Sequence, residues 1–255
     1  MKRVILYTIF CLLTLSGCGD YELVFEEPTL DDITSYLSMK MIYVEGGTFS
    51  MGSSNGESYE RPVHSVTLDS YYIAETEVTQ AQWYAVMRTN TSSYHIGDNY
   101  PVESVTWYEA QEFCEKLSEL TGKKYVLPTE AQWEYAARGG KKSKGYKYSG
   151  SNTINDVAWY YDNSGAETHS VKQKQPNELG IYDMSGNVWE WCSDWYGSYS
   201  SSSQTNPTGP SSGSGRVLRG GSWSSSASNC RVERRNFSNP SDHGSNYGFR
   251  VVCLP

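Results

Sequence analysis

Apolar residues recur at helical spacing in three stretches of the chain, each behind a polar residue that can cap a helix. The first stretch, 80–87, carries Trp83 and Met87 on one side. The second begins at Thr106 and Glu109, whose spacing forms a capping box in which each side chain bonds the other residue's backbone. The apolar stripe of the second stretch consists of Ala110, Phe113, Cys114 and Leu117. These patterns predict two helices.

The third helix is predicted by a second capping box. Thr129 and Gln132 have the capping spacing, and Trp133 points inward behind them. Glycines mark the helix ends, because Gly122 follows the second helix and residues 139–140 follow the third. We therefore expect helices with a defined start and stop.

Shorter segments alternate between apolar and polar residues, which is typical of strands. The segments 41–45, 64–68 and 249–252 predict strands of a small mixed sheet. Between residues 196 and 215 the sequence is almost all Ser, Gly, Thr and Pro. Such a segment buries too little apolar surface to order itself, so we expect an exposed loop.

The amino-acid composition predicts a core rich in aromatic side chains and many tight turns. The chain has 21 Tyr, 8 Trp and 23 Gly, which favours a core of aromatic side chains joined by irregular loops. The 21 basic residues are outnumbered by 29 acidic residues, and the largest basic cluster is 141–144. This balance argues against a nucleic acid partner.

The first residues have the order of a secretory signal. Lys2 and Arg3 precede an apolar run at 4–15, which is too short to cross a bilayer. The sequence Leu15-Ser16-Gly17-Cys18 resembles a bacterial lipobox, which implies cleavage before Cys18 and acylation of its sulfur. An ordinary cleaved signal, in which Cys18 has no special role, is the alternative.

We therefore expect three parts in the chain. Residues 1–17 form a lipoprotein signal peptide, 18–40 a lipidated acidic tether, and 41–255 one globular domain. The lipid anchor makes the membrane a partner. It places the protein in the cell envelope, on the periplasmic or surface face of a bacterial outer membrane.

Four cysteines remain beyond the signal and the anchor: Cys114, Cys192, Cys230 and Cys253. Thiols outside the cytoplasm tend to oxidise, so two disulfides are expected, with three possible connectivities. Free buried thiols are the alternative. The histidines are scattered and give no support to zinc or triad chemistry.

Five motifs together resemble the sulfatase-modifying-factor family, which includes the formylglycine-generating enzymes. They are Leu127-Pro128-Thr129-Glu130, Gly186-Asn187-Val188-Trp189-Glu190-Trp191, Arg219-Gly220-Gly221-Ser222-Trp223, Asn229-Cys230-Arg231 and Tyr247-Gly248-Phe249-Arg250. The resemblance runs from about residue 43 to 253. It implies an α+β fold of the complex C-type lectin-like type, with little regular secondary structure.

The resemblance also implies a pairing of the cysteines. In the family, a helix cysteine at the position of Cys114 pairs with a cysteine just after the Gly-Phe-Arg motif. We expect the disulfides Cys114–Cys253 and Cys192–Cys230.

Formylglycine-generating enzymes hold copper(I) with two cysteines after the Gly-Gly-Ser-aromatic motif and oxidise a substrate cysteine with oxygen. The matching positions are Ser225 and Cys230. A hydroxyl is a hard ligand and does not replace a thiolate for copper(I). We expect neither copper nor oxidase activity; if the protein is an enzyme, Cys230 is its catalytic residue.

The resembled family also holds calcium beside the Trp-Glu-Trp motif. The matching positions are Asp183, Gly186, Val188 and Glu190, which would offer two carboxylates and two main-chain carbonyls. The alternative is that Asp183 and Glu190 form caps or salt bridges without an ion. The arginines at 231, 234, 235 and 250 are expected to pin loops through carboxylate or carbonyl bonds.

The C-terminal segment has the small polar residues and scattered aromatics of paratope-like surfaces. The predicted ligand-binding residues are Trp223, Ser224, Ser226, Ser228, Asn236, Phe237, Asn239, Asp242, His243, Asn246 and Tyr247. The segment also resembles the variable segment of retroelement-diversified proteins built on this scaffold. A plain solvated surface is the alternative.

We therefore expect a lipid-anchored envelope protein that uses the scaffold to bind a protein or glycan ligand, without oxidase activity. Formylglycine formation on a sulfatase cysteine is one alternative. A structural part of gliding or secretion machinery is another.

Overall fold

The computed structural model describes residues 39–94 and 97–255, and residues 40–255 form one compact unit. The signal peptide, the lipidation at Cys18 and nearly all of the tether lie outside the described residues. These remain predictions. Within the described ranges, no helix has the length and apolar character needed to cross a membrane.

All three predicted helices are confirmed. They are α2 (Gln80–Met87), α3 (Trp107–Thr121) and α4 (Glu130–Ala137). Thr79, Thr106 and Thr129 each accept a hydrogen bond from the third residue of the helix, and each capping box is complete. Gly122 ends α3 in the left-handed conformation that favours glycine. The remaining helical turns are η1 (Ser58–Glu60), η2 (Gly140–Lys142), α5 (Ile154–Val157) and η3 (Ala227–Cys230).

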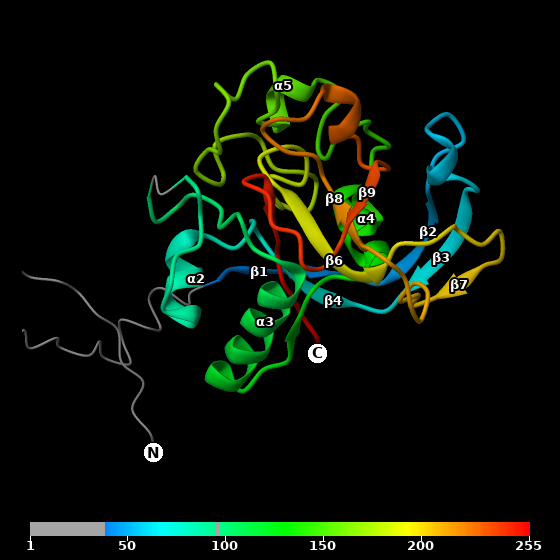
Figure 1. Cartoon of the computed structure of the whole chain (residues 1–255). Coiled ribbons are helices and arrows are strands. Elements are labelled where there is room, and N and C mark those ends of the chain that lie inside the picture. The colour runs from blue at the N-terminus through cyan, green and yellow to red at the C-terminus, as the bar shows by residue number, and fades with distance from the viewer. Residues whose placement is uncertain (1–38, 95–96) are drawn as a thin grey trace, which may run out of the picture. The chain divides into compact units, whose positions relative to one another are not determined.

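The strands form three small sheets, and α2 and α3 lie to one side of them (Figure 1). The first has the order β1 (Met41–Val44), β4 (Tyr71–Ala74), β11 (Val252–Cys253), β5 (Tyr125–Val126). The second has the order β10 (Tyr247–Gly248), β6 (Trp189–Trp195), β8 (Arg216–Arg219), β9 (Arg235–Ser238). The third has the order β2 (Gly47–Met51), β3 (His64–Leu68), β7 (Gln204–Thr205). Because β4 pairs with both β1 and β11, the first sheet joins the two ends of the domain.

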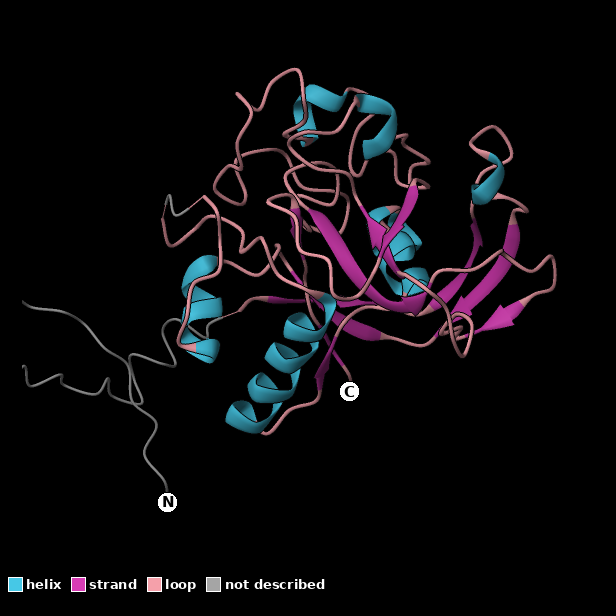
Figure 2. Cartoon of the chain, in the orientation of Figure 1, coloured by secondary structure: helices cyan, strands magenta, loops and turns pink. Residues whose placement is uncertain are grey.

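Loops occupy much of the domain (Figure 2), and large rings fill its core. Trp83 stacks on Phe113 with ring centroids 5.7 Å apart, and Phe249 meets both rings edge-on. A larger cluster surrounds Trp133 and Tyr71. The α+β fold class with limited regular structure is confirmed.

Two of the three predicted strands agree with β1 and β3, whereas the strand predicted at 249–252 is confirmed only at Val252, where β11 begins. Residues 249–251 lie between β10 and β11. Val251 O still accepts from Ala74 N at the end of β4, at 2.9 Å, whereas Phe249 O accepts from Val78 N in the loop after β4, also at 2.9 Å. The Arg250 side chain is drawn to a buried glutamate, and these tertiary contacts interrupt the strand.

The segment 196–215 is exposed over most of its length, as expected, but it is not without structure. Its residues 204–205 form β7 and pair in parallel with β3. Asn206 then exchanges two hydrogen bonds with Asp69, at 2.8 and 2.9 Å. Polar contacts, rather than apolar burial, order this loop.

Candidate functional site

The loop after β8 brings together the two positions that the family motif matches to copper ligands. Gly220 and Gly221 have φ angles of 93° and 79°, and a Cβ on Gly221 would lie 2.7 Å from the Cys230 sulfur. The Ser222 N–H donates to Ser225 Oγ at 3.1 Å and also faces the Cys230 sulfur. The serine hydroxyl and the thiol therefore face the same backbone N–H.

The Ser225 hydroxyl and the Cys230 thiol do not suit copper(I) as ligands. Cys230 is fully buried, and burial raises the pKa of its thiol to about 12, against the weaker opposing effect of the Ser222 N–H. Ser225 offers a neutral hydroxyl that already bonds Ser222. One protonated thiol and one hydroxyl are poor ligands for a soft monovalent ion.

The predicted disulfides are wrong. The four cysteines of the described part are all free thiols and all buried. Cys192 belongs to the large core cluster around Trp133, whereas Cys230 packs with Tyr148 and Tyr160 in a separate cluster.

The second predicted pair fails as well. The Cys253 thiol donates to Leu254 O at 3.6 Å, and burial raises the pKa of Cys253 and that of Cys114 on α3. All four therefore behave as small core residues.

The predicted calcium residues lie in a buried polar cluster. Both Glu190 oxygens accept bonds from the Arg250 guanidinium at 2.7 Å, and Trp133 Nε1 donates to the same carboxylate at 2.7 Å. Asp183 Oδ2 accepts from the Lys172 N–H at 2.8 Å. Desolvation raises the pKa of Asp183 to about 6.

This arrangement matches the salt-bridge alternative better than a calcium site. Arg250 already neutralises Glu190, and a guanidinium beside the carboxylate repels a second cation. Among the described residues, no group of three or more His, Cys, Asp or Glu side chains could hold a metal. Calcium at Asp183, Gly186, Val188 and Glu190 thus stays a prediction that the geometry does not favour.

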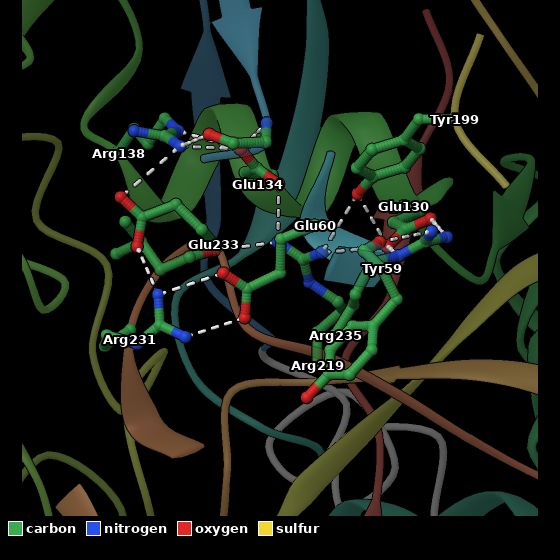
Figure 3. Close-up of polar contacts among 12 residues, drawn as sticks. Tyr59, Glu60, Glu130, Glu134, Arg138, Tyr199, Arg219, Arg231, Glu233 and Arg235 are labelled. Atoms are coloured by element: carbon green, nitrogen blue, oxygen red, sulfur yellow. Dashed lines mark hydrogen bonds and ion pairs between the residues drawn. The ribbon is translucent and has the colours of Figure 1, made fainter. Parts of the chain in front are cut away.

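A second buried ion network fixes the strands that carry the loop (Figure 3). Arg219 donates to Glu130 at 2.8 Å and to Glu134 at 2.7 Å. Arg235 bonds both oxygens of Glu130, and Arg231 bonds both oxygens of Glu60. The expected loop-pinning role is confirmed for Arg231, Arg235 and Arg250, whereas Arg234 lies over the Tyr59 ring. Sequence reasoning missed Glu60 and Glu134.

The predicted ligand-binding residues separate into two groups. In the first, Trp223 Nε1 donates to Ser245 O at 3.1 Å and Asn246 Nδ2 donates to Ser224 Oγ at 3.2 Å. Ser226 and Ser228 share a hydrogen bond of 3.0 Å next to them. Ser224, Ser226 and Ser228 are all exposed.

Two tyrosines that the sequence did not single out complete this first group. The Tyr94 ring meets Trp223 edge-on with centroids 5.7 Å apart, and Tyr161, which is 71% exposed, donates its N–H to Ser225 O. We call this surface the Trp223 face. It consists of Tyr94, Tyr161, Trp223, Ser224, Ser226, Ser228 and Asn246.

The second group follows β9. Phe237 stacks on Tyr196 with centroids 4.4 Å apart, and Asp242 accepts bonds from Ser238 Oγ and Asn239 N. In the β8–β9 ladder Arg235 pairs with Arg219, which adjoins the Gly-Gly-Ser loop, whereas Ser238 pairs with Arg216 at the far end of β8. The Phe237 group therefore lies away from the Trp223 face.

Three residues of the predicted ligand-binding set belong to neither group: Asn236, His243 and Tyr247. Asn236 is half-buried on β9, and His243 is exposed in the loop that follows Asp242. Tyr247 lies on β10 with its ring edge-on to Trp191 at 5.5 Å, so it is half-buried in the frame.

The α+β fold, together with the Gly220-Gly221-Ser222 loop that packs over buried Cys230, is typical of one class of protein domain. The family model described as "Sulfatase-modifying factor enzyme 1-like domain" matches residues 33–254, and the chain belongs to this family.

Individual relatives extend the comparison. Treponema denticola variable protein 1 is similar in structure, with a TM-score of 0.80 and 37% identity over 85% of this chain and 95% of that one. The chaperone protein LppX of Paenibacillus barcinonensis is 35% identical over 85% of this chain and 90% of its own length. The formylglycine-generating enzyme of Streptomyces coelicolor is 31% identical over 83% of this chain and 88% of its own.

Proposed function

We propose that this domain is a recognition module of its family, which binds a partner in the cell envelope through the Trp223 face and does not oxidise cysteine. The observation that carries the proposal is that the two matching positions hold one hydroxyl, Ser225, which bonds Ser222, and one buried thiol, Cys230, where an oxidase of the family needs two sulfurs.

Two further features support recognition. The exposed hydroxyls of the Trp223 face stand on a loop whose backbone is bonded to the frame, as in Trp223 N to Asn187 O at 2.7 Å. Small hydroxyls beside exposed rings suit adaptable binding surfaces. The similarity to a protein called Treponema denticola variable protein 1 supports the proposal that the exposed side chains of this face determine which partner is bound.

The second candidate is the formylglycine-generating oxidase, with Cys230 as its catalytic residue. It is favoured by the identity with the Streptomyces coelicolor enzyme, which extends over most of both chains. The anchor at Cys18 and the envelope location belong to the first proposal, and metabolic labelling with a radioactive fatty acid, lost in Cys18→Ala, would test them.

Site-specific photo-crosslinking tests the recognition function. We expect a benzoylphenylalanine at position 224 or 228 to give discrete adducts in intact cells, while the same group at exposed Lys123 gives none. In parallel, the purified protein with copper(I), oxygen and a sulfatase-type cysteine peptide should leave the peptide unchanged. Formation of the aldehyde would favour the oxidase, and equal adducts from all three positions would contradict the proposed face.

A further inference from the structure

Arg216 on β8 is held flat between two indole rings. Its guanidinium carbon lies 3.8 Å from the centroid of Trp107 and 3.6 Å from that of Trp195. Nη1 donates to Ser193 O at 2.6 Å, and this bond fixes the orientation of the guanidinium within its own plane. The guanidinium is therefore positioned without help from a carboxylate.

One edge of this guanidinium is unused. Nε is buried and has no hydrogen-bond partner, and Nη2 bonds no residue of the described part of the chain. Buried donors are seldom left without an acceptor in native proteins. The Nε–Nη2 edge presents two parallel N–H groups, the geometry that suits a pair of ligand oxygens.

Two adjoining hollows meet at this arginine. One has a volume of about 300 Å³ and the other of about 470 Å³, and both are lined by Trp107, Gln111, Glu115 and Arg216. The smaller hollow continues over Tyr125, and the larger over Tyr108, whose side chain is 55% exposed. The combined space is of the size that small ligands occupy.

The charges around the hollow favour a neutral ligand. The Glu115 carboxylate lies on the same rim as Arg216, so a ligand carboxylate would be repelled there. The neighbouring Glu112 is paired with Lys116 at 2.8 Å. Gln111 Nε2 donates to Glu115 Oε1 at 3.2 Å, which leaves the second Glu115 oxygen and the Gln111 carbonyl oxygen as acceptors beside the Arg216 donors. Donors next to acceptors match adjacent hydroxyl groups.

We propose that the Arg216 hollow binds a neutral saccharide. The Nε–Nη2 edge of Arg216 donates to two adjacent sugar oxygens, Glu115 and Gln111 bond the neighbouring hydroxyls, and the exposed Tyr108 ring packs on the apolar face of the sugar. This site is separate from the Trp223 face, because Arg216 lies at the opposite end of β8 from the Gly-Gly-Ser loop. It does not depend on the function proposed for that face.

The test is binding of the purified full chain to an array of immobilised neutral oligosaccharides and their sialylated counterparts. We expect retention on neutral members. Tyr108→Ala and Glu115→Ala should each weaken it at least tenfold, since both side chains are exposed and can be removed without unfolding the domain. Tyr84→Ala, also an exposed tyrosine on a helix, is the matched control and should bind as the parent does.

Arg216→Met complements these variants, because it keeps an aliphatic chain between the two rings and removes both donors. It should abolish retention while the far-UV circular dichroism stays unchanged. Absence of binding to every neutral member, binding to sialylated members alone, or equal binding by the parent, Tyr108→Ala and Glu115→Ala would each overturn the proposal.

Discussion

Replacing Ser225 by cysteine should turn the Cys230 loop into a copper(I) site. The Ser222 N–H faces both the Ser225 hydroxyl, at 3.1 Å, and the Cys230 sulfur. A sulfur at position 225 would therefore face the same backbone N–H as the existing thiol. Two thiolates give the coordination that copper(I) accepts.

The burial of the Cys230 thiol limits how tightly the natural protein can bind copper(I). The pKa of Cys230 is raised to about 12 by burial, so forming its thiolate at pH 7 costs about 7 kcal/mol at about 1.4 kcal/mol per pKa unit. In the natural protein a single copper–sulfur bond must offset that cost. We expect the second sulfur of Ser225→Cys to tighten copper(I) binding at least a hundredfold, or about 3 kcal/mol.

The assay is competition for copper(I) against a chromophoric chelator, under reducing and oxygen-free conditions. Ser225→Ala is the control for loss of the hydroxyl, and Ser225→Cys combined with Cys230→Ser is the control for a lone thiol at 225. An affinity of Ser225→Cys no higher than that of Ser225→Ala, with unchanged thermal unfolding, would refute the reasoning.

Three further predictions concern the buried charges. Glu134→Ala should lower the free energy of unfolding by about 3–5 kcal/mol, because it leaves buried Arg219 with one carboxylate fewer. Urea denaturation measures this free energy, and a loss below about 1 kcal/mol would contradict the prediction. Burial raises the pKa of Asp194 from 3.8 to about 7, so the native state favours the protonated acid and loses up to about 4 kcal/mol of stability as the pH rises through that window. Asp194→Asn should therefore gain stability over the natural protein between pH 4.5 and 8, and a difference independent of pH would exclude this cause. Removal of calcium with EGTA should leave the thermal midpoint unchanged, because Arg250 already neutralises Glu190, whereas a drop that calcium restores would show that the ion binds.

The helices could be predicted because their signals are local. Each start depends on a threonine and a Glu or Gln three residues later, and the ends of α2 and α3 are set within one or two residues. Of the strand predicted at 249–252, only Val252 belongs to β11, because distant groups determine the conformation of 249–251. Phe249 is packed by Trp83 and Phe113, and Arg250 by Glu190, which lies 60 residues earlier.

The candidate site was predictable to the same degree. The motif spacing matches Ser225 and Cys230 to one site, and in the structure both side chains face the Ser222 N–H. The ion network was not predictable, since Arg231 meets a carboxylate, Glu60, that is 171 residues away in the chain. Pairing of the cysteines failed for the same reason: the core cluster that surrounds Cys192 is assembled from many separate segments.

The buried ion network and the exposed serines of the Trp223 face differ in how far stability constrains their side chains. Arg219 and Arg235 are buried and bonded to carboxylates of α4, so substitutions there are expected to cost several kcal/mol, on the order of 3–5 for a broken buried pair. Ser224 and Ser228 are exposed, and they bond the side chains of Asn246 and Ser226, so substitutions there are expected to change stability by less than about 0.5 kcal/mol. Stability therefore constrains the frame and leaves the face free to change its specificity. Ser225 belongs with the buried residues, because its hydroxyl accepts a hydrogen bond from Ser222 N inside the loop.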